Sequence, residues 1–301
     1  MNNTNTIKVN RSQNGFSLRQ VLKECLELSS KQINRYIDNG QVFVNKKKET
    51  HGSSKLRSGD LIECNINSSD KTQSKKPVKI EVLFEDDDFY AINKPPGIPS
   101  QKTKDAKRIT IESLIHNECR KRNEKPYILL HRLDRDTSGV LLFAKHKSSS
   151  QIGFELFKHR EIKKEYIALC KGNLHPKSGK WENYLDKKGK RSGKDYYESV
   201  RSGGMPAKTS YNVLEQSKMY SLVHLKPHTG RTHQLRVHLS EAKAPIVGDT
   251  LYDTRQSDQI SHHLLHAYKL FIPSENPVEI SAPFPDSFTT FADQCQLKLP
   301  K

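Results

Sequence analysis

A short loop crowded with charge leads straight into an apolar run at residues 131–144. Within HRLDRD, five of the six side chains are ionisable. The run VLLFA that follows, residues 140–144, has no polar member, which is typical of a strand covered on both faces. Charges at the edge of a core are unfavourable unless they pair or take part in chemistry. The stretch therefore predicts either a structural ion pair or a reactive carboxylate, Asp134, held between Arg132 and Arg135.

The charge balance of the whole chain indicates a polyanionic partner. The 301 residues include 51 Lys and Arg against 34 Asp and Glu, a net charge of +17, with 34% hydrophobic residues for a core. Residues 1–80 carry 15 basic and 7 acidic side chains, so positive charge is denser there than in the rest of the chain. Solvated surface lysine is the alternative explanation, but the concentration of charge at one end favours a nucleic-acid partner.

The cysteines and the apolar segments limit the compartment and the class of protein. The five cysteines are scattered without a C-x-x-C pair, so neither a disulfide framework nor a zinc ribbon is predicted. No segment approaches the roughly 18 apolar residues of a membrane span. The first residues are polar and lack the apolar region of a signal peptide. We therefore expect a soluble, cytoplasmic protein with no membrane association.

A polar stretch at residues 67–78, NSSDKTQSKKPV, separates two parts of different character. We interpret it as a linker. It would be preceded by a tail and small domain, residues 1–66, and followed by a larger domain, residues 79–301. In the small domain, Ser17 and Gln20 have the spacing of a capping box, and apolar residues then recur at helical spacing.

The rest of the small domain is predicted to combine a second helix with a sheet. Ser29 and Gln32 repeat the cap signal, and this helix ends at Asn39-Gly40. Strands are predicted at 41–45 and 61–66, with a basic turn after the first of them. The cations expected to form an RNA-binding surface are Lys31, Arg35, Lys46, Lys47 and Lys48. A generic basic helical hairpin is the alternative.

From residue 79 onward the pattern changes to strands separated by short helices and loops. The segments VKIEVLFEDDDFYAIN, KKEYIALCKG, YNVLEQ and MYSLVHLKP predict strands, without a regular βαβ alternation. We therefore expect an α+β fold class, with a mixed, mainly antiparallel β-sheet in the larger domain. Residues 175–199 are basic and poorly periodic, which favours a long hairpin or a mobile insertion whose role is open.

Polar clusters lie at the edges of three predicted strands. Besides the Asp134 loop, these are KKEY, which contains Tyr166, and HTGRTHQLRVH, residues 228–238. The last has three His spaced five residues apart, about 140° apart on a helix, so they do not converge on a metal. A helix is expected to begin near Thr232, where its N-terminal amides would suit a phosphate. Tyr166 is either a core aromatic or a stacking surface for a base.

The order and spacing of several motifs add a resemblance. HRLDRDTSG is preceded by NKPPGIPS and followed by KKEYIAL, TGRTHQLRVHL, PIVGDTLY and LHAYKLFI. Over about residues 80–285 this pattern resembles the RluA-type RNA pseudouridine synthases. The small domain resembles the S-four-type RNA-binding domain over about residues 16–66, although it opens with Ser-Leu-Arg where that domain often has Arg-Leu-Asp. Many members of the family carry such a domain at the N-terminus.

The resemblance implies an isomerisation of uridine to pseudouridine that needs no cofactor and no metal. It implies that Asp134 is the catalytic carboxylate, that Tyr166 stacks on the uracil, and that Arg231 pairs with Asp134. Arg132 would lie near the displaced nucleotide. Whether Asp134 acts as a nucleophile or as a base stays open. The further substrate-binding residues expected are His131, Thr137, His233, Gln234 and Arg236.

Hypotheses from different classes follow. The first is an isomerase that flips uridines out of structured RNA, with ribosomal RNA preferred to transfer RNA by family analogy. The second is a non-catalytic RNA-binding or ribosome-assembly factor on the same scaffold, in which a carboxylate facing RNA would have no use. A metal-dependent hydrolase conflicts with the His spacing. We expect a monomer.

Overall fold

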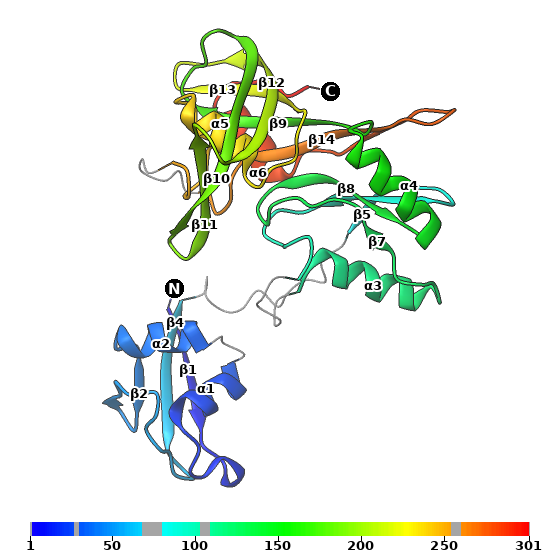
Figure 1. Cartoon of the computed structure of the whole chain (residues 1–301). Coiled ribbons are helices and arrows are strands. Elements are labelled where there is room, and N and C mark those ends of the chain that lie inside the picture. The colour runs from blue at the N-terminus through cyan, green and yellow to red at the C-terminus, as the bar shows by residue number, and fades with distance from the viewer. Residues whose placement is uncertain (1, 27–29, 68–79, 103–108, 254–259, 301) are drawn as a thin grey trace. The chain divides into compact units, whose positions relative to one another are not determined.

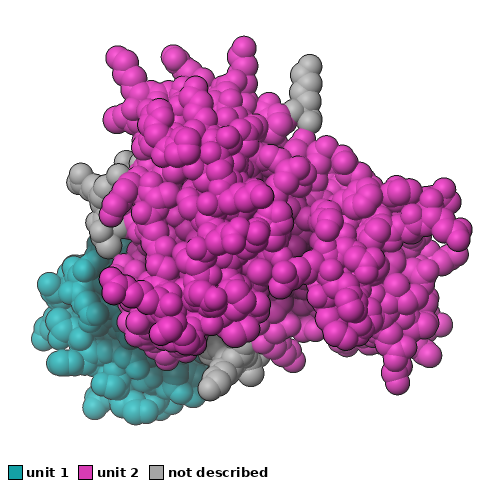
Figure 2. All heavy atoms as spheres, turned by 45° about the horizontal axis from the view of Figure 1, so that its top comes forward, with its two compact units in different colours: residues 1–79 teal, residues 80–301 magenta. Residues whose placement is uncertain are grey.

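The computed structural model describes residues 2–26, 30–67, 80–102, 109–253 and 260–300. The chain forms two compact units, residues 1–79 and 80–301 (Figure 1, Figure 2). The expected linker lies outside the described residues, apart from Asn67. Within the described ranges, no helix is long and apolar enough to cross a membrane.

The first unit packs two helices against a small sheet. Its elements are β1 (Asn2–Lys8), η1 (Arg11–Gln13), α1 (Leu18–Leu26), α2 (Ser30–Asp38), β2 (Val42–Val44), β3 (Lys47–Lys48) and β4 (Leu61–Asn67). The sheet order is β1-β4-β2-β3. Leu18 and Leu22 of α1, Ile33 of α2 and Ile62 of β4 are buried in one core cluster. Helical spacing of the apolar residues thus brings both helices onto the sheet.

Local signals account for much of this unit. The backbone N–H of Ser17 donates to Gln20 Oε1 at 2.9 Å and that of Gln20 donates to Ser17 Oγ at 3.4 Å, so the predicted capping box is present. The second cap, on Ser29, lies outside the described residues. The predicted basic turn is shorter than expected. Asn45 and Lys46 are left-handed, with φ of 50° and 66°, and the next two lysines already form β3.

The second unit is built on one long sheet. Its elements are β5 (Glu81–Glu85), β6 (Phe89–Lys94), α3 (Ile111–Lys121), β7 (Ile128–Leu129), β8 (Ser138–Ala144), α4 (Lys147–Lys158), β9 (Lys163–Lys171), β10 (Ser178–Arg191), β11 (Lys194–Val200), β12 (Met205–Gln216), β13 (Tyr220–Pro227), α5 (Gln234–Glu241), β14 (Leu265–Ile272), β15 (Val278–Ser281) and α6 (Asp286–Gln294). The strand order is β11-β10-β12-β13-β9-β14-β8-β6-β5, with β15 beside β14 and β7 beside β8. Along this path only the β14–β8 pairing is parallel, so the expected α+β fold with a mixed, mainly antiparallel sheet is confirmed.

The apolar run at 140–144 forms most of β8, and both faces of that strand are covered as predicted. Every residue of β8 is buried. Leu141 and Phe143 belong to the core cluster on one face, and Val140 and Leu142 belong to the cluster on the other. The strand therefore anchors the charged loop that precedes it between two cores.

Gly139 allows β8 to lie against β14 where the two halves of the sheet meet (Figure 1). Its φ is 107°, and a Cβ built there would lie 2.1 Å from the carbonyl oxygen of Ala267 on β14. Only glycine combines that dihedral with such a close approach. Gly139 thus fixes the position at which the chain passes from the charged loop into the sheet.

Residues 178–200 form a long antiparallel hairpin, β10–β11, which confirms the hairpin interpretation of this region. β10 also pairs with β12, so the hairpin extends the main sheet. In Figure 1 it projects past α5.

Candidate active site

A large pocket opens beside the Asp134 loop. Its volume is about 1130 Å³. Three segments far apart in the sequence line it: the loop at 129–134, the region from the end of α4 into β9 at 157–166, and the β13–α5 connection at 226–236. These are the three polar clusters that the sequence places at strand edges. The fold brings them to one site.

A buried lysine holds the Asp134 loop from behind. Lys94, at the end of β6, is fully buried, and its Nζ donates to the carbonyl oxygens of Pro95 at 3.0 Å, Arg135 at 2.9 Å and Thr137 at 2.7 Å. Burial lowers the pKa of Lys94 to about 7, an effect that Asp136 and Asp134 partly oppose. Two of these carbonyls, those of Arg135 and Thr137, belong to the loop, so the ammonium ties the loop backbone to the core.

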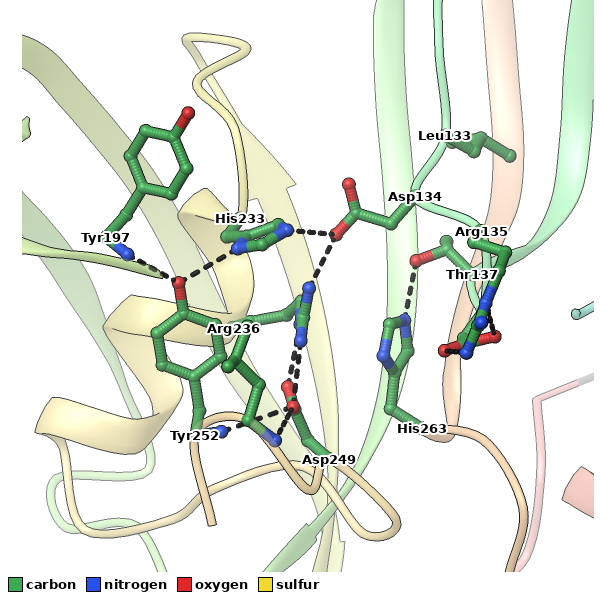
Figure 3. Close-up of polar contacts among 12 residues, drawn as sticks. Leu133, Asp134, Arg135, Thr137, Tyr197, His233, Arg236, Asp249, Tyr252 and His263 are labelled. Carbon is green, nitrogen blue, oxygen red and sulfur yellow. Dashed lines mark hydrogen bonds and ion pairs between the residues drawn. The ribbon is translucent and has the colours of Figure 1, made fainter. Parts of the chain in front are cut away.

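The hydroxyls of Thr137 and Ser138, which follow the loop, are bonded to buried histidines. Thr137 Oγ1 lies 2.8 Å from His263 Nε2, and Ser138 Oγ lies 2.9 Å from His266 Nδ1. Thr137 is buried, and its contact with His263 holds the end of the loop in place (Figure 3). Thr137 was expected to bind substrate, but its hydroxyl is already bonded within the protein.

Asp134 faces the pocket between an arginine and a histidine of the β13–α5 region (Figure 3). Arg236 Nη1 donates to Asp134 Oδ2 at 3.1 Å, and His233 Nε2 lies 3.8 Å from the same oxygen. Burial alone would raise the pKa of this carboxyl, but His233 and Arg236 more than offset that effect and hold the pKa below its usual value. Burial lowers the pKa of His233, so at neutral pH Arg236 is the partner that keeps Asp134 ionised.

The arginine that pairs with Asp134 differs from the one expected. Arg231 Nε donates to the carbonyl of Pro206 at 3.0 Å, and it is Arg236 that contacts Asp134. The predicted Arg231–Asp134 pair is therefore wrong. Helix α5 begins at Gln234, so Arg231 stays in the loop before it, whereas Arg236 lies on the buried face of the helix.

Arg236 bridges two carboxylates. Its Nε donates to Asp249 Oδ2 at 2.7 Å and its Nη2 donates to Asp249 Oδ1 at 2.8 Å, a bidentate pair at the base of the site (Figure 3). Burial would raise the pKa of Asp249, but the bonds from Arg236 lower it to about 2. Asp249 therefore fixes the plane of the guanidinium, which leaves Nη1 directed at Asp134.

A tyrosine sets the protonation of His233. The backbone N–H of Tyr197 on β11 donates to Tyr252 Oη at 3.1 Å, and that oxygen lies 2.9 Å from His233 Nδ1. No other acceptor for this hydroxyl appears among the described residues, so its hydrogen goes to Nδ1. The proton of neutral His233 is then on Nε2, on the side of Asp134. Through Tyr197 the β10–β11 hairpin contributes to this arrangement (Figure 3).

Tyr166 lies in the same pocket, on β9. It is 8% exposed, and burial, followed by the charge of Asp134, raises its pKa, so the phenol is neutral. Gln234 also lines the pocket, but its amide bonds internally to Thr229 Oγ1, Arg231 N, Lys208 O and Thr209 Oγ1. The expected substrate contact from Gln234 is therefore replaced by a role in holding the loop.

The three histidines of residues 228–238 have separate partners. His228 Nε2 lies 2.8 Å from Ser210 Oγ, while His238 bonds to Thr209 and Asn183, both at 2.9 Å. His233 instead faces Tyr252 and Asp134. The three rings thus point to different parts of the unit.

The remaining expected residues are distributed as follows. Arg132 is exposed at the pocket, and His131 Nε2 accepts a hydrogen bond from Leu142 N at 3.1 Å. In the first unit Arg35, Lys46, Lys47 and Lys48 are exposed, and the side chain of Lys31 lies outside the described part of the structure. Reasoning from the sequence did not single out Lys94, Tyr197, Asp249 or Tyr252. Three of these, all but Tyr197, stand in the motifs NKPPG and GDTLY.

Comparisons with known proteins identify the family of the chain. Residues 88–241 match the family model described as RNA pseudouridylate synthase. YhcT of Bacillus subtilis (strain 168), an uncharacterized RNA pseudouridine synthase, is 31% identical over 288 residues, 93% of either chain. The ribosomal large subunit pseudouridine synthase D of Yersinia pestis is 31% identical over 252 residues, which cover 82% of this chain and 76% of that one.

A solved structure gives the same result. The human RNA pseudouridylate synthase domain containing 4 superposes with a TM-score of 0.64 and 26% identity, over 73% of this chain and 95% of that chain. The fold and these similarities define an RNA pseudouridine synthase, an isomerase. Within that class, the chain belongs to the RluA-type family.

Proposed function

We propose that this enzyme converts uridines of ribosomal RNA to pseudouridine, with Asp134 as the catalytic carboxylate. The observation that carries the proposal is the hydrogen bond from Arg236 Nη1 to Asp134 at the wall of a pocket large enough for a nucleotide, because this contact favours the ionised carboxylate. An ionised carboxylate can act as a nucleophile or a base, and it cannot act as a general acid.

The reaction needs a group that can assist detachment of the base from the sugar. Uracil leaves its ribose, turns and rejoins through ring carbon five, with no net oxidation or reduction. Asp134 would attack the sugar or the base, or remove a proton from the sugar. The His233 Nε2–H on the same side would stabilise charge on the carboxylate between steps.

Tyr166 and Arg132 would manage the flipped nucleotide. Tyr166 is a neutral phenol near Asp134 on the pocket wall, which suits stacking on the uracil. Arg132 is exposed beside Asp134 and would occupy the space that the uridine leaves. Unstacking the base costs a few kcal/mol, which contacts with the RNA backbone must offset. Arg231, partly exposed at the pocket, would contribute to binding the RNA backbone.

The first unit would provide affinity for folded RNA. Its exposed cations on α2 and around the β2–β3 turn are suited to the phosphate backbone, as in an S-four-type domain. A large-subunit ribosomal RNA target is supported by the names of relatives such as the Yersinia pestis enzyme. We expect the enzyme to act in the cytoplasm and as a monomer.

The target is tested by tritium release from carbon-five-labelled uridine. Unmodified transcripts of bacterial large-subunit, small-subunit and transfer RNA are each incubated with the full chain. Release from large-subunit RNA alone is expected. Release confined to transfer RNA would overturn the target, and binding without release from any transcript would favour the RNA-binding-factor alternative.

A further inference from the structure

Lys164 is a cation of the pocket wall that the mechanism above does not use. It lies on β9, where successive side chains point to opposite faces. Glu165 therefore points away from it and pairs with His224 at 2.9 Å and with Lys226 at 2.6 Å. Lys164 shares its face with Tyr166, and both line the pocket.

The ammonium of Lys164 has no anionic partner. Among the described residues, no carboxylate lies within ion-pair distance and no acceptor is hydrogen-bonded to its Nζ. This nitrogen instead lies 5.7 Å from the centre of the Phe157 ring, and 3.8 Å from where a Cβ on Gly230 would be. The side chain is only partly exposed, and burial lowers its pKa. The ammonium is accessible from the pocket, where an anionic ligand can supply the missing partner.

A hydrogen-bond donor close to Lys164 also lacks a partner. The His131 ring lies tilted against the same Phe157 ring that Lys164 contacts, with ring centroids 5.0 Å apart. Because its Nε2 accepts from Leu142 N, its proton is on Nδ1, and that N–H has no partner among the described residues. The ammonium of Lys164 and the nearby N–H of His131 therefore favour an anion at this wall of the pocket.

The spacing along β9 relates Lys164 to the base. Alternate residues of a strand are about 6.6 Å apart, so Lys164 lies one such step from Tyr166. Asp134 lines the same pocket as these two side chains. A nucleotide whose base contacts Tyr166 would therefore have its backbone within reach of Lys164.

We propose that Lys164 binds a phosphodiester of the RNA strand beside the flipped uridine, so that neighbouring residues of β9 hold the base and the backbone of one nucleotide. This inference rests on the proposed function. It assigns Lys164 a role in binding substrate and no part in the chemical step.

The test compares Lys164→Met with wild type. Methionine keeps the apolar stem on Phe157 and removes the charge. We measure the association constant for unmodified large-subunit RNA transcript, and the single-turnover rate of tritium release, over a series of KCl concentrations. The slope of log association constant against log salt should become shallower by about 0.7–0.9, the value for one lost phosphate contact. Lys164→Arg should restore it.

Stability separates this role from a structural one. Removing a partly exposed charge that has no anionic partner in the protein should leave the midpoint of thermal unfolding unchanged or raise it. A variant that unfolds or loses stability would overturn the proposal, because the ammonium would then serve the fold. An unchanged slope, with or without a slower reaction, would also overturn it, since a contact to uracil releases no counterion.

A matched control variant makes the result specific. Lys269 on β14 is ion-paired with Glu279, and Lys269→Gln should change neither slope nor rate. Wild type that binds RNA but releases no tritium would defeat the proposed function alone, because the difference in salt slope would still report the phosphate contact. Wild type that is active while Lys164→Met keeps the full slope would defeat the Lys164 inference alone.

Discussion

Arg236 is predicted to serve stability and activity through two different carboxylates. Its guanidinium is bound by two hydrogen bonds to Asp249, whose side chain is 1% exposed, and by one to Asp134, which is 29% exposed. The perturbation is Arg236→Met, which keeps most of the volume and removes the charge. Asp249 is then left as an unpaired anion in the core.

The loss of stability can be worked from that geometry. Removing one partner of a buried pair costs about 3–5 kcal/mol, because the other charge stays uncompensated. The Asp134 contact adds little, since that carboxylate is accessible from the pocket. In Arg236→Met/Asp249→Asn both charges of the buried pair are gone, and most of the lost free energy of unfolding should return. Activity should not return, because Asp134 still lacks its cation and its pKa rises.

Urea unfolding and single-turnover tritium release are measured on wild type, Arg236→Met and Arg236→Met/Asp249→Asn. The expected pattern is an unstable, inactive single variant and a more stable, inactive double variant. The reasoning is refuted if Arg236→Met loses less than about 1 kcal/mol, below the range for a buried pair. It is equally refuted if the double variant regains both stability and full activity.

Further predictions address the residues around this pair. Tyr252→Phe removes the donor to His233 Nδ1, and should slow single-turnover release about tenfold, or 1.4 kcal/mol, while the free energy of unfolding falls by about 1 kcal/mol; an unchanged rate would contradict the assigned tautomer. Arg231→Gln should reduce the salt dependence of RNA binding and leave the pH profile of the rate unchanged, and a shifted profile would show contact with Asp134. Asp249 has a native pKa of about 2, against 3.8 unfolded, so its stabilisation is complete above about pH 5 and is lost as pH falls toward 2. The size of this effect is about 2 kcal/mol, and urea unfolding of Asp249→Asn should lack that decrease.

Local sequence signals predicted those parts of the fold that local interactions determine. The apolar run in β8 and the Ser17–Gln20 cap depend on neighbouring residues, and both appear as expected. β1 was missed because NNTNTIK has no alternating apolar pattern, and the strand forms by pairing with β4. The edge that accepts it lies about sixty residues away in the chain.

The site was predicted in outline, and its pairing was not. The three clusters that form the pocket were recognised from their places at strand edges, but the choice between Arg231 and Arg236 depends on where α5 begins. His233 precedes the helix with φ of 58°, and Asp249 holds Arg236 from a separate loop. Neither feature has a signal in the spacing of TGRTHQLR. The contribution of Tyr197 is a backbone N–H, which leaves no mark on the sequence at all.

The most direct test of the central claim is single-turnover pseudouridine formation by Asp134→Asn on unmodified large-subunit ribosomal RNA. The amide keeps the shape of the side chain and can accept from Arg236, but it is neither a nucleophile nor a base. RNA binding and urea unfolding are expected to stay close to wild type, with no tritium released and no pseudouridine formed. Pseudouridine formed by this variant at the wild-type rate would contradict the assignment of Asp134 as the catalytic carboxylate.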